Sequence, residues 1–322
     1  MWVDARARAG QSQRMVDVRI FCTDLAGLRS QALGLAEAAG LAHELSTLRF
    51  RKPWASIPTN FWLLPKLAVG AEAFRAPLPP VVMGVGGAGA RVAAALRGIN
   101  TAAVAVQHPR MRLSRFDAIL AARHDGISGA NVIITRTALH RVTAARLAAE
   151  RAIWAPRFAH LRRPLVAVLL GGSNGRYRFE APEAAALAAN LARIAPGCGL
   201  VITPSRRTGP EVVAHLRAVL EPLGAWIWNF EGENPYFGML ACADAIIATA
   251  DSVSMVSEAV ATHAPVYLVR LPGKSTRIGA FMDELARDGR VRNFEGQLDL
   301  WPVQPLDDTA EAGAELRRRL GL

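Results

Sequence analysis

Short apolar runs alternate with amphipathic segments along most of the chain, which is the pattern of buried strands connected by helices. In the first half, runs rich in Val, Ile and Ala predict strands at residues 15–22, 44–48, 80–85, 101–106, 118–122 and 130–135. Periodic apolar positions predict helices at residues 30–39, 91–97 and 143–157. An aromatic and Pro-rich stretch at residues 51–65 interrupts the alternation.

The same alternation restarts at Leu165 and continues to Val269. Strands are predicted at residues 165–170, 199–203, 225–230, 244–249 and 265–269, and helices at residues 182–194, 210–220, 236–242 and 252–261. Strands that alternate with helices form parallel sheets through right-handed crossovers. The pattern therefore predicts an α/β fold of two Rossmann-like domains that face each other across a cleft.

The run Arg162-Arg163-Pro164 breaks the pattern between the two halves and marks the expected domain boundary. Residues 1–14 lack apolar periodicity and are expected to form a flexible arm, because they cannot bury enough surface to offset the entropy of ordering. Residues 15–163 are the predicted N-terminal domain, and residues 164–322 are the predicted C-terminal, nucleotide-binding domain. The segment after about Lys274 is expected to return toward the first domain.

The composition is that of a globular protein, with 51% hydrophobic residues and no apolar stretch of about 18 residues without a charge. The N-terminus lacks the apolar core of a secretory signal, so we expect a cytoplasmic protein that contacts the inner face of the membrane peripherally, if at all. The three cysteines lie far apart in the sequence, and no Asp-x-Asp motif occurs. Neither a disulfide framework nor a metal site is therefore expected.

The net positive charge of the chain comes from its first half. Residues 1–163 contain 23 Lys and Arg against 9 Asp and Glu, a balance of +14, whereas residues 164–322 contain 15 against 18, a balance of −3. A basic domain suits nucleic acid, a phospholipid surface or a phosphorylated acceptor. A solvated surface of Arg-rich composition explains the same numbers, because 35 of the 38 basic residues are Arg. Among the anionic partners we expect a membrane surface or a lipid-linked acceptor rather than nucleic acid.

The segment Gly84–Gly89 matches G-x-G-x-x-G after a predicted strand, the pattern of a dinucleotide site. Such a site belongs on the first strand of its unit and has an acid about 20 residues later for the ribose. Here no Asp or Glu occurs between Glu72 and Asp117, and none of the three tyrosines is followed by Lys four residues later. NAD chemistry and an NAD-dependent epimerase are therefore rejected, and no cofactor is expected.

Gly171-Gly172-Ser173-Asn174-Gly175 is a G-x-S-x-G sequence directly after a strand. A serine hydrolase would use Ser173 as a nucleophile, with Asp251 and His263 in the right chain order. The residues after the motif are polar and aromatic, however, whereas a nucleophile elbow turns directly into a helix. We favour a phosphate or sugar site in which Gly171, Gly172, Ser173 and Asn174 supply hydrogen-bond donors.

Two further strand ends carry candidate nucleotide ligands. After the strand at 199–203, Ser205 and Arg206 could hold a diphosphate, although a capped turn with solvated arginines explains them equally well. After the strand at 244–249, Ser252 and Ser254 open a helix whose free N–H groups favour an anion. Glu258 lies one and a half turns inside that helix, where its carboxylate could accept both ribose hydroxyls. The alternative is a plain helix cap and a surface acid.

Several segments together resemble one family, and they lie at residues 24–35, 131–142, 171–174, 203–208, 233–238 and 249–259. The sequence resembles the mitochondrial fission (elongated-mitochondria) family over about residues 15–295, most specifically in the last of these segments. That family is similar to GT-B glycosyltransferases such as the peptidoglycan lipid-linked N-acetylglucosamine transferase. The resemblance implies that Gly171–Ser173 and Glu258 contact a nucleotide. It also implies a non-enzymatic role in the plant members, which recruit a dynamin-type GTPase to a membrane.

In these relatives the first loop usually contains Gly-His, but here Gly27 is followed by Leu28. Asp24 is then the only proton acceptor near that loop, and it is the candidate catalytic residue. The hypothesis is a GT-B-like protein that binds a nucleotide sugar and transfers the sugar, without a metal, to an anionic or membrane-linked acceptor. The alternatives are a non-catalytic adaptor at a membrane surface and, third, a serine hydrolase. The residues leave open whether the chain is an enzyme.

Overall fold

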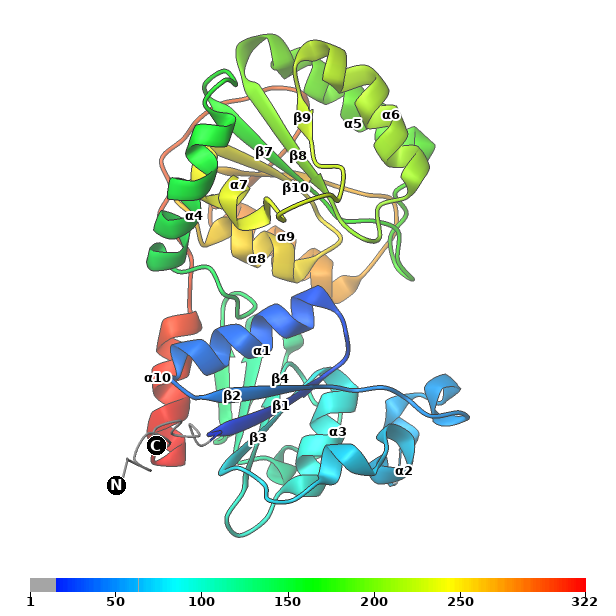
Figure 1. Ribbon diagram of the computed structural model, residues 1–322, viewed down its shortest axis with the longest axis vertical. Helices are drawn as coiled ribbons and strands as arrows, with labels where there is room; N and C mark the ends of the chain where they lie inside the picture. The colour runs from blue at the N-terminus through cyan, green and yellow to red at the C-terminus, as the bar shows by residue number, and fades with distance from the viewer. Residues whose placement is uncertain (1–15, 63) are drawn as a thin grey trace, which may run out of the picture. The chain divides into compact units, whose positions relative to one another are not determined.

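The computed structural model describes residues 16–62 and 64–322 (Figure 1). The predicted flexible arm, residues 1–14, lies outside the described residues. The described residues form two six-stranded sheets, one from strands before residue 136 and the other from strands after residue 164. The predicted α/β fold class, with two separate sheets, is confirmed.

The first sheet has the strand order β2-β1-β3-β4-β5-β6. Its strands are β1 (Val18–Cys22), β2 (His43–Thr47), β3 (Val81–Val85), β4 (Ala102–Val106), β5 (Ala118–Ala122) and β6 (Val132–Thr135). The helices of this part of the chain are α1 (Ala26–Ala38), α2 (Pro65–Val69), α3 (Gly86–Leu96) and α4 (Ala144–Phe158). Strands β3, β4 and β5 are buried on both faces, which explains their unbroken apolar sequence.

Helix α3 begins immediately after β3, five residues earlier than predicted, and close backbone packing explains why. A Cβ at Gly84 would lie 2.1 Å from the carbonyl oxygen of Gly89, and a Cβ at Gly89 would lie 2.2 Å from that of Phe21. Gly86 has a φ of +69° at the start of the helix. The glycine motif therefore allows a strand and a helix to approach each other closely through a tight turn.

The second sheet has the order β12-β11-β10-β7-β8-β9, and each neighbouring pair is parallel. Its strands are β7 (Leu165–Leu170), β8 (Gly199–Pro204), β9 (Trp226–Ile227), β10 (Ala245–Thr249), β11 (Val266–Val269) and β12 (Val291–Asn293). The chain moves outward from β7 through β8 to β9, and then crosses back to β10 on the other side of β7. Ligands of open α/β sheets bind at such a reversal of strand order, at the carboxyl ends of the strands.

Helices cover both faces of the second sheet (Figure 1). They are α5 (Ala181–Ile194), α6 (Pro210–Leu220), α7 (Tyr236–Cys242), α8 (Val253–Val260) and α9 (Thr276–Arg287), and α10 (Thr309–Leu320) follows. Alternate residues of β7 enter two separate apolar clusters: Leu169 packs with α7, α8 and α9, and Val168 packs with α5 and α6. Short 3-10 turns occur at 54–56, 59–61, 71–74, 113–115, 123–125, 195–197 and 221–223.

By contacts the chain divides into two compact units, one ending at Ile119 and including Gly313–Leu322, and the other spanning Leu120–Ala312. Within the first unit, α10 packs against the end of α1, where Arg317 Nη1 donates to the carbonyl of Ala39 at 2.9 Å. The domain boundary at residues 163–164 stays a prediction. No helix among residues 16–62 and 64–322 is long and apolar enough to cross a membrane.

Arg290 fixes the end of helix α8. Its side chain is buried and donates to the carbonyl oxygens of Val260 and Thr262, both at 2.8 Å, and to that of Ala264 at 3.2 Å. These carbonyls lie at and just beyond the carboxyl end of α8, where a cation also complements the helix dipole. Burial lowers the pKa of Arg290 to about 10, so the guanidinium remains charged at neutral pH.

Replacing Arg290 by Met should lower the free energy of unfolding by roughly 1–3 kcal/mol, because buried carbonyl oxygens lose their donor. Urea denaturation followed by circular dichroism measures the effect. Arg287→Met is the control, since Arg287 is exposed at the end of α9 and should tolerate the same change. Equal midpoints for the two variants would show that Arg290 does not stabilise α8.

Candidate functional site at the carboxyl ends of β7, β8 and β10

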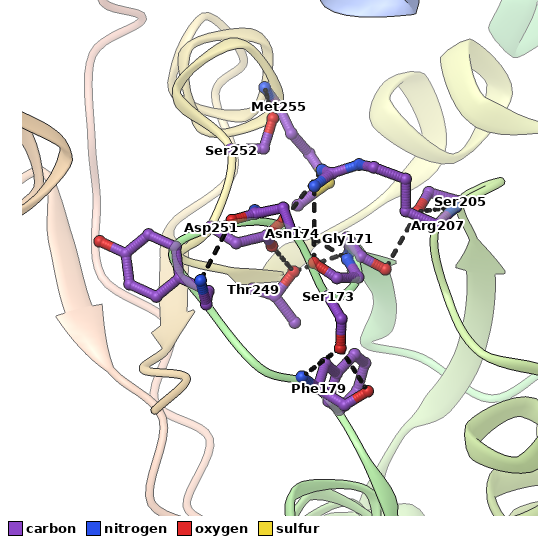
Figure 2. Close-up of polar contacts among 12 residues, drawn as sticks. Gly171, Ser173, Asn174, Phe179, Ser205, Arg207, Thr249, Asp251, Ser252 and Met255 are labelled. Carbon is purple, nitrogen blue, oxygen red and sulfur yellow. Dashed lines mark hydrogen bonds and ion pairs between the residues drawn. The ribbon is translucent and has the colours of Figure 1, made fainter. Parts of the chain in front are cut away.

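Three loops meet at one edge of the second sheet, because β10, β7 and β8 are adjacent and parallel. They are residues 171–180 after β7, 205–209 after β8 and 250–252 after β10. Figure 2 shows the polar contacts that join them. The structure thus brings the predicted residues Gly171, Ser205 and Ser252 into one region.

The two glycines after β7 pack against the other two loops. The N–H of Gly171 donates to Thr249 Oγ1 at 2.7 Å, and that hydroxyl donates in turn to Asp251 Oδ1 at 2.7 Å. A Cβ at Gly171 would lie 2.0 Å from Asp251 Oδ1, and a Cβ at Gly172 would lie 2.0 Å from the carbonyl oxygen of Arg207. Glycine is therefore required here by neighbours within the protein.

Asp251 forms an ion pair with Arg207 beside the glycine loop (Figure 2). The Asp251 side chain is fully buried, and its Oδ2 lies 2.9 Å from Arg207 Nη2 and 3.4 Å from the N–H of Gly172. The Arg207 side chain, by contrast, is 41% exposed. A guanidinium has five N–H donors in a planar fork, so part of Arg207 remains accessible to a ligand at the mouth of the site.

The side chains of Ser173 and Asn174 are hydrogen-bonded within their own loop. Ser173 Oγ accepts from the N–H of Phe179 at 2.8 Å and donates to its carbonyl at 3.2 Å. Asn174 Oδ1 accepts from the N–H groups of Arg176 at 2.8 Å and Tyr177 at 3.1 Å. These hydrogen bonds stabilise the backbone conformation of the loop, so both side chains have a structural role within it.

Ser173 does not have the geometry of a hydrolase nucleophile. Helix α5 begins only at Ala181, whereas a nucleophile elbow leads directly into a helix. The serine of a nucleophile elbow lies in a strained turn, but Ser173 is not one of the non-glycine residues with positive φ in the described part of the chain. Asp251, the expected third member of a triad, is bonded to Thr249 and Arg207. The geometry argues against the hydrolase hypothesis.

Ser205 ties the β8 loop to the β7 loop. Its Oγ donates to the carbonyl of Gly171 at 3.0 Å, and Thr208 Oγ1 donates to the same oxygen. The N–H of Ser205 donates to Thr208 Oγ1 at 2.9 Å. This turn directs Arg207, the residue after the predicted Arg206, toward Asp251. The sequence prediction chose Arg206 and missed Arg207, because the sequence does not show which of two adjacent arginines points toward the site until the conformation of the turn is known.

Helix α8 begins at the same edge. Ser252 is its N-cap, and Ser252 Oγ accepts from the N–H of Met255 at 3.3 Å. The first amides of an α-helix have no partner within the helix, and the helix dipole adds positive potential there. Ser254 lies in this first turn. The start of α8 is thus an electropositive backbone site next to Asp251 and Arg207.

Glu258 lies on α8 and is buried, with 6% of its surface exposed. Its Oε2 accepts a hydrogen bond of 2.6 Å from the hydroxyl of Tyr236, the first residue of α7. Burial, together with the neighbouring Glu258 charge, raises the pKa of Tyr236 well above its ordinary value of 10. Tyr236 therefore remains a protonated donor to the carboxylate.

The predicted catalytic residue Asp24 lies in the other compact unit. Its carboxylate is 57% exposed and lies 3.0 Å from Arg29 Nη1 on α1. Its catalytic role stays a prediction, as do the ligand roles assigned to the other predicted residues. No group of three or more His, Cys, Asp or Glu side chains that could hold a metal ion is present among the residues described.

Comparisons with known proteins identify relatives and structural neighbours. The sequence family described as "Mitochondrial fission ELM1" matches residues 26–320. The mitochondrial fission protein ELM1 of Arabidopsis thaliana is 34% identical over 276 residues, which are 75% of this chain and 64% of the plant protein. The chain thus spans less than two thirds of that relative.

Solved structures with the same fold are remote in sequence. The MnaA–UDP complex from S. aureus has a TM-score of 0.55 at 11% identity and covers 96% of this chain and 98% of its own. The UDP-GlcNAc 2-epimerase from Neisseria meningitidis bound to UDP-GlcNAc has a TM-score of 0.54 at 13% identity and covers 94% and 98%. These similarities confirm the GT-B-like fold.

A single methyl group at Gly172 should destabilise the site. Because a Cβ there would meet the backbone of Arg207, Gly172→Ala should cost roughly 1–3 kcal/mol of stability and lower the melting temperature. Gly175→Ala is the matched control in the same loop, since a Cβ at Gly175 would have nothing within 4 Å. Thermal melts of the two variants decide the question, and a Gly172→Ala melt equal to that of the control would contradict this close packing.

Proposed function

The chain belongs to the mitochondrial fission ELM1 family, and from that premise we propose that its Leu120–Ala312 unit binds a nucleoside-diphosphate sugar at the edge formed by β7, β8 and β10. The observation that carries the proposal is the position of Arg207. Its half-exposed guanidinium lies over the Gly171-Gly172 turn, on a sheet whose strand order reverses at this point. Such reversals are where ligands of open α/β sheets bind.

The diphosphate would be held by positive groups from two loops. Arg207 supplies guanidinium N–H groups, and the start of α8 after Ser252 supplies backbone N–H groups and the helix dipole. The buried Asp251 carboxylate would repel a bound diphosphate. Its ion pair with Arg207, however, compensates the negative charge of the carboxylate and holds the guanidinium beside the glycine loop. Glu258 would accept the ribose hydroxyls from the same helix.

In an enzyme, this arrangement would assist departure of the nucleoside diphosphate. Charge that develops on the leaving phosphate oxygens would be stabilised by groups already in place, and no metal ion is required for that role. The reaction we propose is transfer of the glycosyl group to an anionic or membrane-linked acceptor. Because the structural neighbours include complexes with UDP and UDP-GlcNAc, a uridine nucleotide is the first ligand to test.

A second candidate function, attachment to a membrane surface as an adaptor, is favoured by the segment before β3. Phe61, Leu64 and Leu67 follow one another at intervals of three residues and are 68%, 61% and 52% exposed. Exposed basic side chains, including Arg51 and Lys66, accompany them. Apolar side chains flanked by cations suit the interface of an anionic bilayer.

Replacing Glu258 by Ala should weaken binding of UDP by on the order of tenfold or more, because two charge-assisted hydrogen bonds are worth roughly 1.5–3 kcal/mol each. Titration calorimetry with UDP, and with the other nucleoside diphosphates as a panel, measures the change. Glu295→Ala, an exposed acid of the same unit, is the control. If the wild-type protein binds no nucleoside diphosphate at all, the adaptor function takes precedence.

The membrane function makes a separate prediction. The double variant Phe61→Ser, Leu64→Ser should bind vesicles of phosphatidylcholine with 30% phosphatidylglycerol several-fold more weakly than the wild type in co-sedimentation, as apolar contact is lost. Binding should also fall steeply between about 50 and 500 mM salt. A variant with Ile99→Ser and Leu223→Ser, which removes exposed apolar side chains elsewhere, should bind normally. Equal wild-type binding to neutral and anionic vesicles would exclude this attachment.

A further inference from the structure

His140 is a buried titratable side chain that the proposed nucleotide site does not use. It lies between β6 and α4, and its side chain is fully buried. The ring Nδ1 accepts a hydrogen bond of 3.3 Å from the N–H of Val142. The ring Nε2 has no hydrogen-bond partner, although Asp307 Oδ1 lies 3.4 Å away. Because an accepting ring nitrogen carries no proton, the Val142 contact assigns the proton of a neutral ring to Nε2.

Three elements of the Leu120–Ala312 unit meet around this ring. From the segment before α4, the N–H of Ala138 donates to Ser257 Oγ on α8 at 3.0 Å. From the segment before α10, the N–H of Leu306 donates to a carbonyl oxygen at the end of α8 at 2.8 Å. The N–H of His140 itself lies 3.4 Å from Thr309 Oγ1. His140 therefore joins two segments that both hydrogen-bond to helix α8.

The surroundings of the ring hold it neutral at neutral pH. Burial lowers the pKa of His140 below its ordinary value of 6.5. The charges of Asp307, Glu258 and Asp308 act in the opposite direction but do not cancel the effect of burial. Asp308 is already paired with Arg136, whose Nε lies 2.9 Å from its Oδ1. Asp307 Oδ1 already accepts a backbone N–H at 2.7 Å.

A second proton on the ring is incompatible with these contacts. It would occupy Nδ1, where the N–H of Val142 already donates, so two donors would face each other. The Val142 N–H would then lose its partner, and an unpaired buried donor is costly. A charged ring at full burial would also lack the solvation that it has in water. Protonation therefore favours conformations in which the ring of His140 reaches solvent.

We infer that His140 is a pH-sensitive switch: protonation of its ring releases residues 136–142 and 306–309 from helix α8, and loss of the proton restores them. Release returns the ring to water, where its ordinary pKa of about 6.5 applies. Below that pH the released form binds more protons than the closed form, so the opening constant rises as the pH falls. The inference concerns the carboxyl end of α8 and does not rest on nucleotide binding at its start.

The test measures amide hydrogen exchange by NMR on the full chain at pH 7.5 and 5.5, relative to the intrinsic exchange rates. The opening constants reported by the amides of Val142 and Leu306 should rise about tenfold between the two pH values. Carboxylates ordinarily titrate near pH 4, so this interval isolates the histidine. The N–H of Phe294 is the internal control, because it donates to the carbonyl of Leu268 at 2.9 Å, away from the switch.

Two variants assign the effect to His140. In His140→Asn the amide oxygen can accept from the N–H of Val142 but cannot be protonated, so the rise between pH 7.5 and 5.5 should disappear. His215→Asn is the matched control, since His215 is exposed on α6, and this variant should behave as the wild type does.

Unchanged opening constants in the wild type between pH 7.5 and 5.5 would overturn the inference. A rise that persists in His140→Asn would overturn it as well, because another group would then be responsible. If His140→Asn does not fold, an NMR titration of the His140 ring in the wild type decides. A ring that gains its proton at or above pH 6.5 while Val142 and Leu306 stay protected would contradict the switch.

Discussion

The Asp251 carboxylate lies where the ends of three adjacent strands converge, and a charge at that depth requires compensation from its surroundings. Thr249 supplies a hydroxyl, Gly172 an N–H group and Arg207 a guanidinium. The carboxylate also constrains the surrounding loops. Gly171 must lack a side chain to make room for it, and Arg207 must point toward it. Removing one partner of such a group is costly because the charge is left uncompensated. The shape of the whole edge thus follows from one buried acid.

Much of the fold could be predicted from the sequence where local signals and tertiary structure agree. Helices α6 and α7 have the predicted bounds, and α6 has Pro at its first turn. Helix α1 begins at Ala26, four residues before the predicted start at Ser30. The prediction missed this start because the N-cap residue, Leu25, makes no side-chain capping hydrogen bond and so gives no local signal. Strand β9 covers only two of the six predicted residues. The predictions ended at Val269 although Ser275 caps α9, a signal that the sequence contained.

The sequence indicated which loops carry the candidate residues, but it did not indicate how their side chains are hydrogen-bonded. Strand-end loops with Gly, Ser and Arg are visible in a sequence, and the topology brings them together as expected. Whether a polar side chain is used internally depends on turns that sequence does not reveal. Ser173 bonds to the backbone of Phe179, and the turn at Ser205 selects one arginine of an adjacent pair. Tyr236 lies in the segment 233–238 that contributes to the family resemblance, but its hydrogen bond to Glu258 could not be predicted because Glu258 lies on a different helix.

The first compact unit is discontinuous in sequence, since it needs residues 313–322 as well as those before 120. During synthesis the Leu120–Ala312 unit can therefore be complete while the unit that began earlier still lacks its last helix. Chains usually fold from the N-terminus as domains emerge from the ribosome, at about 5–20 residues per second. Here the end of α1 stays uncovered until Arg317 has been synthesised. The unit whose synthesis begins first is therefore the one that is completed last.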